Sequence, residues 1–168
     1  MILDLFGAKF DIHMEDTLAY YAVESQERCN CAYCRNFSAA VDKVYPSLRP
    51  FLVQFGVDID APVESMPFDQ PNEIWYENVY SVCGQILTGE TSSFFVEGVE
   101  IRVHSENSLD VNSNCPAPCF YLSVGMMVLP WVLTESMSAV VSPANEPSFM
   151  RKMWNRLLGK VKDTEPLS

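Results

Sequence analysis

Three cysteines within six positions, Cys29, Cys31 and Cys34 in the stretch ERCNCAYCRNF, have the types and spacing most typical of a chemical site in this sequence. Cys31 and Cys34 form a C-x-x-C pair, a spacing that lets two thiolates reach one tetrahedral zinc ion. Cys115 and Cys119, in the stretch CPAPC, could supply a second pair from a proline-rich loop. One hypothesis is therefore a four-cysteine zinc site built on Cys31, Cys34, Cys115 and Cys119, with zinc as the cofactor.

Two further interpretations of the C-x-x-C pair are open. In thioredoxin-like proteins such a pair follows a strand and begins a helix, whose dipole lowers the thiol pKa. Cys31 does precede a predicted helix, but the β-α-β context is missing and Tyr33 provides no special activation. Alternatively, Cys34 and Cys83 pack as small apolar residues, a common fate of free cysteines. We expect Cys34 to be buried rather than reactive, Cys29 and Cys31 to be freer, and the two cysteine pairs to lie apart.

Other catalytic patterns are weak. The two histidines, His13 and His104, both fall on what the alternation predicts to be the outward face of a strand. The sequence contains no G-x-S-x-G, H-E-x-x-H or glycine-rich phosphate-binding pattern. Acidic pairs are numerous because the whole chain is acidic, so none of them is singled out. The sequence favours a binding protein over an enzyme without deciding between them.

The composition of the 168-residue chain, with 48% hydrophobic residues, indicates one folded domain of ordinary size. The chain has 22 acidic and 11 basic residues, a net charge of −11. Because so acidic a surface repels phosphate backbones, we expect no nucleic-acid partner. The N-terminus lacks the basic start and apolar run of a signal peptide, and no stretch reaches the roughly 18 apolar residues that span a bilayer. We expect a cytoplasmic protein whose cysteines are thiols or metal ligands.

Alternation of apolar and polar residues predicts several strands. In KFDIHMED, Phe10, Ile12 and Met14 alternate with polar residues, and a polar turn follows. We expect a hairpin here, with a return strand in TLAYYAVES, residues 17–25. Later strands are predicted over residues 74–90, over residues 92–106 (two strands, or one bulged around Glu97 and Gly98), and over residues 119–133, a segment buried on both faces.

One helical segment separates the early strands from the late ones. Tyr33, Phe37, Ala40, Val41 and Val44 recur at helical spacing, and Pro46 should end or kink the helix. A second short helical piece is predicted from about Pro50 to Gly56, followed by an acidic, proline-rich connecting loop over residues 57–73. The fold class is therefore α+β: a mainly antiparallel sheet, with a helix kinked or split at Pro46 packed on one face.

The C-terminal region differs in charge from the rest of the chain. Residues 148–168 hold five basic and two acidic residues, whereas the remaining chain holds six basic and twenty acidic ones. At helical spacing, one face is apolar and the other is basic. We expect a single α+β domain over residues 1–147, a basic amphipathic C-terminal helix over residues 148–162 and a tail over residues 163–168.

This C-terminal helix has three interpretations. It docks on its own domain, it lies in a groove of a protein partner, or it lies on an anionic membrane surface, the least favoured of the three. For a protein partner, the binding residues would be Met153, Trp154 and Leu157 on the apolar face, with Arg151, Lys152, Arg156 and Lys160 on the basic one. The sequence favours a non-catalytic protein-interaction module, with a zinc- or thiol-dependent site on Cys31 and Cys34 as the alternative.

The stretch CAYCRNFSAAVDKVYPSLRPFLVQFGVDIDAP resembles a group of small uncharacterised bacterial proteins. The shared pattern is a C-x-x-C followed by Asn and Phe, a helix, and a Gly-hydrophobic-Asp end before a proline. It maps here onto Cys31, Cys34, Asn36, Phe37, Gly56, Val57, Asp58 and Pro62. The resemblance implies a bacterial or phage-type protein and brings no activity with it.

Overall fold

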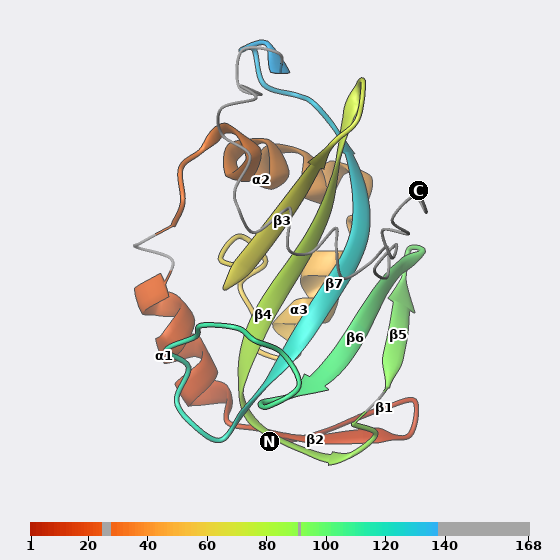
Figure 1. Ribbon diagram of the computed structural model, residues 1–168. Coiled ribbons are helices and arrows are strands. Elements are labelled where there is room, and N and C mark those ends of the chain that lie inside the picture. The colour runs from red at the N-terminus through yellow and green to blue at the C-terminus, as the bar shows by residue number, and fades with distance from the viewer. Residues whose placement is uncertain (25–27, 91, 138–168) are drawn as a thin grey trace, which may run out of the picture. The chain divides into compact units, whose positions relative to one another are not determined.

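The computed structural model describes residues 1–24, 28–90 and 92–137. Three helices and seven strands are formed there (Figure 1). In chain order they are β1 (Ile2–Leu5), β2 (Ala8–Ile12), α1 (Met14–Glu24), α2 (Ala32–Val44), α3 (Leu48–Val53), β3 (Glu64–Asp69), β4 (Glu73–Thr88), β5 (Ser93–Val96), β6 (Val99–Ser105) and β7 (Cys119–Pro130).

All seven strands form one antiparallel sheet in the order β1-β2-β4-β7-β6-β5, with β3 paired to β4. The predicted α+β class and the mainly antiparallel sheet are confirmed. The predicted split around Glu97 is also confirmed, because β5 ends at Val96 and β6 begins at Val99. Helix α2 ends at Val44 and α3 begins at Leu48, with Pro46 between them.

Strand β4 changes partners at Gly84. Before Gly84, β4 pairs with β3 and β7; from Gly84 to Thr88 it pairs with β2. Gly84 has a φ of +138°, and a Cβ atom there would lie 2.1 Å from the carbonyl oxygen of Asp11. Only glycine permits both this conformation and this approach of the two backbones.

Phenylalanine rings fill the curl that results. Phe10 on β2 and Phe94 on β5 are separated by β4, β7 and β6 in the strand order, yet their ring centroids lie 6.2 Å apart. Phe55, just after α3, reaches Phe10 at 5.5 Å and Phe120 at 6.5 Å. The sheet therefore wraps around an aromatic core of Phe10, Phe55, Phe94 and Phe120, with the half-buried Phe51 at its edge. Phe6 touches Phe94 from outside this core and is itself exposed.

The predicted return strand over residues 17–25 is wrong, because this stretch belongs to helix α1. Thr17, Tyr20 and Tyr21 are its buried residues, and their spacing of three and four is that of one helix face. Tyr20 and Tyr21 favour a strand by intrinsic propensity, which explains the wrong prediction. The hairpin partner of β2 is instead β1, which precedes it.

The predicted loop over residues 57–73 is wrong in part, because residues 64–69 form β3. Pro67 lies inside this strand, opposite Tyr76 of β4. A proline is tolerated because, among the strands of the described residues, β3 pairs with β4 alone and so forms an edge.

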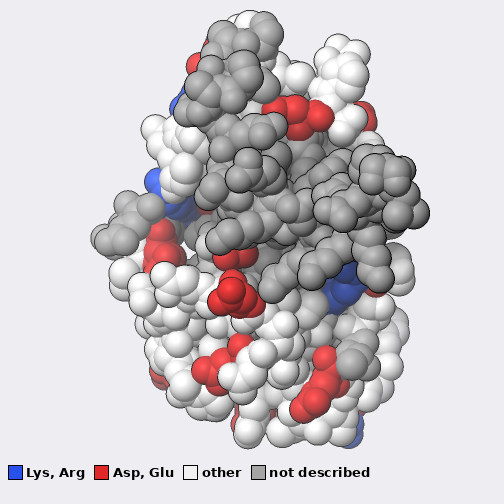
Figure 2. All heavy atoms as spheres, in the orientation of Figure 1, with Lys and Arg blue, Asp and Glu red and all other residues white. Residues whose placement is uncertain are grey.

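The described elements all belong to one compact unit, Met1–Leu133; a second unit begins at Thr134. The predicted boundary after residue 147 and the predicted helix over residues 148–162 lie outside the described residues. None of the helices in the described ranges is long and apolar enough to cross a membrane. Acidic side chains are spread over the described part of the face in Figure 2, in keeping with the net charge of −11.

We predict that Gly84→Ala lowers the free energy of unfolding by about 3 kcal/mol or more, because a backbone carbonyl occupies the position of the new methyl group. Chemical denaturation followed by circular dichroism measures the change. Gly125→Ala is the matched control: the Cβ there meets its nearest atom at 3.8 Å, an ordinary contact. Equal stability of the two variants would contradict the role assigned to Gly84.

Candidate metal centre

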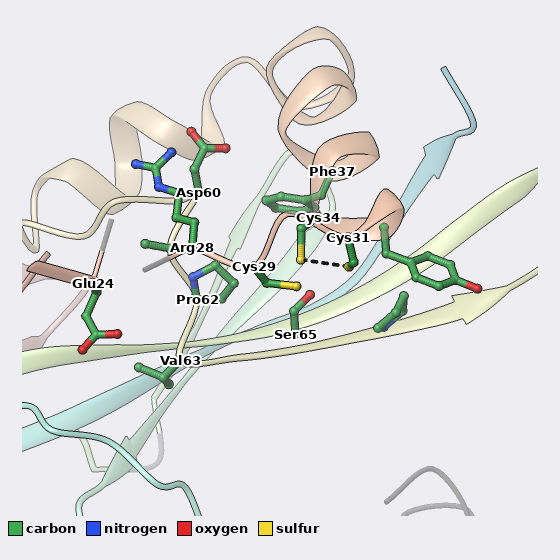
Figure 3. A pocket seen from close by; sticks show the side chains of 13 residues that line it. Glu24, Arg28, Cys29, Cys31, Cys34, Phe37, Asp60, Pro62, Val63 and Ser65 are labelled. Atoms are coloured by element: carbon green, nitrogen blue, oxygen red, sulfur yellow. Dashed lines mark hydrogen bonds between the residues drawn. The ribbon is translucent and has the colours of Figure 1, made fainter. Parts of the chain in front are cut away.

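The first turn of helix α2 and the segment before it bring three cysteines together. Cys31 is the N-cap of α2, with an extended backbone (ψ of 164°), and its side chain makes no capping hydrogen bond. Cys34 lies one turn further on, and Cys29 lies two residues before the cap. The Sγ atoms of Cys29, Cys31 and Cys34 all lie within 4.8 Å of one another. Figure 3 shows their sulfur atoms gathered at this end of the helix.

The spacing of the sulfur atoms fits a single tetrahedral metal ion. With Zn–S bonds of about 2.3 Å, two sulfur ligands of a tetrahedral zinc lie about 3.8 Å apart. The Sγ atoms of Cys31 and Cys34 are 3.6 Å apart, and the third sulfur lies within 4.8 Å of both. Small rotations of the cysteine side chains are therefore enough to place all three sulfurs around one ion.

The thiols of this cluster differ in pKa. Hydrogen bonds from the backbone N–H and the thiol of Cys31 lower the pKa of Cys29. Burial and the neighbouring Cys31 raise the pKa of Cys34 well above its ordinary value. Without a cation, Cys29 therefore loses its proton more readily than Cys34 does. A bound cation would favour thiolates at both positions.

Helix α2 is held against the sheet by Asn36 and Phe37, two residues after the C-x-x-C pair. The Asn36 side chain is fully buried; its Oδ1 accepts from the backbone N–H of Val132 at 2.7 Å, and its Nδ2 donates to the carbonyl of Pro130 at 3.1 Å. The ring of Phe37 packs on Tyr76 of β4 at 5.2 Å. These contacts fix the start of α2, and hence Cys34, relative to β4 and β7.

Tyr76 supplies a further tie from the sheet to the same turn. Its hydroxyl donates to the carbonyl of Tyr33 at 2.9 Å, between Cys31 and Cys34 in the chain. The Tyr33 hydroxyl in turn donates to both carboxylate oxygens of Asp69, at 2.9 and 3.0 Å. Tyr33 of helix α2 is thus hydrogen-bonded to both β3 and β4.

A cavity of about 330 Å³ adjoins the cysteine cluster. Cys29, Cys31 and Cys34 line it, together with Ser65 of β3 and the apolar residues around Pro62. In the view of Figure 3, the side chains of Cys29 and Ser65 point toward one another. Any ion held by the three sulfurs would therefore have open space beside it.

Ion pairs between arginines and aspartates lie beside this cavity, and Arg28 and Asp60 are the members that line it. Arg28 pairs with Asp58 at 2.6 Å, and Arg49 pairs with Asp60 at 2.9 Å and Asp42 at 2.9 Å. Asp60 lines the cavity, and its Oδ1 atom is buried without a hydrogen-bond partner.

The four-cysteine site predicted on Cys31, Cys34, Cys115 and Cys119 is not the group that the structure brings together. Cys115 lies against Cys83, with 3.0 Å between their sulfurs, and Cys119 faces Cys83 in the register of β4 and β7. The cysteine pairs thus belong to two separate groups. Cys83 is buried at 1% exposure, as predicted, whereas Cys34 is only half-buried.

Cys29 was missing from the predicted ligand set. Its signal was present in the sequence, because C-x-C-x-x-C places one cysteine on an extended segment before the cap and one a helical turn after it. The predicted partner-binding residues, by contrast, all lie outside the described residues: Arg151, Lys152, Met153, Trp154, Arg156, Leu157 and Lys160.

We predict that Asn36→Ala lowers the free energy of unfolding by about 2 kcal/mol, because it removes two part-buried hydrogen bonds, from the Val132 N–H and to the Pro130 carbonyl. Ser38→Ala, an exposed change in the same helix, is the matched control and should alter stability little. Urea denaturation of both variants measures the difference. A neutral Asn36→Ala would show that the two bonds do not hold α2.

Comparison with protein-family models, with curated proteins and with solved structures gives no significant match to the chain. The resemblance of the stretch from Cys31 to Pro62 to small bacterial proteins stays a prediction. The chemistry of this site is therefore inferred from its own residues and their geometry.

Proposed function

We propose that the protein binds one zinc ion through the thiolates of Cys29, Cys31 and Cys34. The observation that carries this proposal is the convergence of three Sγ atoms within 4.8 Å at the start of a helix anchored to the sheet. Thiolates are soft ligands and favour zinc over magnesium or calcium. Two of the cysteines are exposed and the third is half-buried, so an ion can reach them from solution.

The fourth coordination position, in this proposal, faces the cavity of about 330 Å³ and takes a ligand from solution. Three protein ligands and one open position are typical of zinc sites that bind or activate a small molecule, whereas structural sites use four protein ligands. The three cysteines all line the cavity, which supports this assignment. The protein would then be a zinc-dependent binding protein for a small ligand.

We predict that the reduced, metal-free protein takes up about one equivalent of Co²⁺ as a zinc probe, with the near-ultraviolet thiolate-to-cobalt absorbance and the visible bands of a tetrahedral site. Cys29→Ser, Cys31→Ser and Cys34→Ser should each weaken binding at least tenfold. Cys115→Ser is the matched control and should bind cobalt as the unchanged protein does. Equal binding by all four variants would place the metal elsewhere.

The same titration reports on pH and on the open position. Because the pKa of Cys34 is raised in the metal-free protein, binding must displace its proton, so affinity should rise with pH and fall as the solution is acidified. Added imidazole should alter the visible bands if the fourth position is open. Bands that stay unchanged would show that the chain itself fills this position.

A thiol–disulfide activity of Cys31 and Cys34 is the competing function of the same residues. Their 3.6 Å separation, with Cys31 exposed at the helix start and Cys34 more buried, favours it. No cobalt uptake together with rapid, reversible oxidation of this pair would support the redox function and overturn the zinc proposal.

A protein-interaction role for residues 148–162 is a second proposal, supported by the charge difference between this region and the rest of the chain. We predict that deleting residues 148–168 leaves the denaturation midpoint unchanged, because a helix that docks on a partner contributes nothing to its own domain. Circular dichroism during urea denaturation measures the midpoint. A marked loss of stability would instead assign the region to the domain's own core.

A further inference from the structure

A second group of thiols lies where β4 changes partners. Cys83 is the last residue of β4 before Gly84, and its sulfur lies 3.0 Å from that of Cys115. Cys119, the first residue of β7, lies opposite Cys83 in the strand register. These three cysteines are distinct from the cluster at the start of α2 and have no part in the proposed zinc site.

The loop that carries Cys115 is held in place from both ends. Ser113 shares hydrogen bonds with Ser81 of β4 at 2.8 Å and with Tyr20 of α1 at 3.3 Å, and it accepts from the N–H of Cys115 at 3.1 Å. After the cysteine, the carbonyl of Pro118 accepts from the N–H of Gly84 at 2.7 Å. The position of the Cys115 sulfur against Cys83 is therefore fixed by bonds independent of the thiols.

We propose that Cys83 and Cys115 form a reversible disulfide by exchange with a small-molecule disulfide such as oxidised glutathione. Two sulfurs 3.0 Å apart need to close by only about 1 Å to reach the covalent length of about 2.05 Å. A disulfide here would tie the loop before β7 to the centre of the sheet. The site is thus a modification site for thiol–disulfide chemistry.

The exposure of the two thiols assigns their roles. Cys115 is partly exposed, so its thiolate can attack one sulfur of oxidised glutathione and release one glutathione thiolate, which takes up a proton. Cys83 is only 1% exposed and cannot meet glutathione, but it touches Cys115. After losing its proton, Cys83 attacks the Cys115 sulfur of the mixed disulfide. The products are the protein disulfide and a second molecule of reduced glutathione.

The reaction should be slow at neutral pH and faster as pH rises. Burial raises the pKa of Cys115 and of Cys119, so few thiolates are present near pH 7. The disulfide should therefore form slowly, under sustained oxidising conditions. Rapid oxidation, as in a peroxide sensor, is not expected here.

The test is to incubate the reduced full-length protein with oxidised glutathione and to map the products by mass spectrometry of a non-reduced tryptic digest. Trypsin separates the cysteines by cluster: Cys29, Cys31 and Cys34 fall in residues 29–35, Cys83 in residues 44–102, and Cys115 with Cys119 in residues 103–151. We expect residues 44–102 joined to residues 103–151, and we expect reduction to reverse the link.

Matched variants identify the sulfur involved. Cys119→Ser should retain the link. Cys115→Ser, a change in a partly exposed loop residue, should lower the amount of linked peptide at least tenfold. The oxidised protein should also melt at a higher temperature than the reduced one. A link that survives Cys115→Ser, stable glutathione adducts without a link, or a link formed only after denaturation would each overturn the proposal. The zinc proposal is unaffected by any of these outcomes.

Discussion

The path of β4 through the sheet is the constraint on which the rest of the structure depends. Its early part is flanked by β3 and β7, and its last part turns to pair with β2 because Gly84 permits the backbone of Asp11 to approach. Both cysteine groups are tied to this strand. Tyr76 bonds to the turn that carries the first group, and Cys83 itself belongs to the second.

Tyrosine hydroxyls make this arrangement rigid. Tyr76 and Tyr80 are both fully buried; Tyr76 donates to the carbonyl of Tyr33, and Tyr80 donates to the carbonyl of Ile59 at 2.8 Å. Burial raises the pKa of both phenols, so they stay protonated and remain donors throughout the physiological range. A buried donor without its acceptor is unfavourable by about 1–3 kcal/mol, which disfavours any displacement of the helix or of the loop after α3.

Local patterns predicted the parts of the fold that depend on local periodicity. The strands from β4 onward and the stripe of α2 were readable because alternation or helical spacing extends over many residues. Helix α1 could not be predicted in this way. Tyr20 and Tyr21 favour a strand by local propensity, and their burial on one helix face depends on tertiary packing. The cysteine site was half predicted: spacing indicated Cys31 with Cys34, whereas the exclusion of Cys115 depends on long-range pairing of β4 with β7.

The two thiol groups differ in the property that decides their chemistry, which is access of water to the sulfur. In the first group Cys29 and Cys31 are exposed, and the N–H of Cys31 lowers the pKa of Cys29, which makes its thiol easier to deprotonate when a cation binds. In the second group burial raises the pKa of Cys115 and Cys119, which favours neutral thiols. Cys83 and Cys119 are buried, so an ion would have to shed its water to reach their sulfurs, whereas a disulfide is uncharged. The same residue type thus suits metal binding at the end of α2 and covalent pairing at the end of β4.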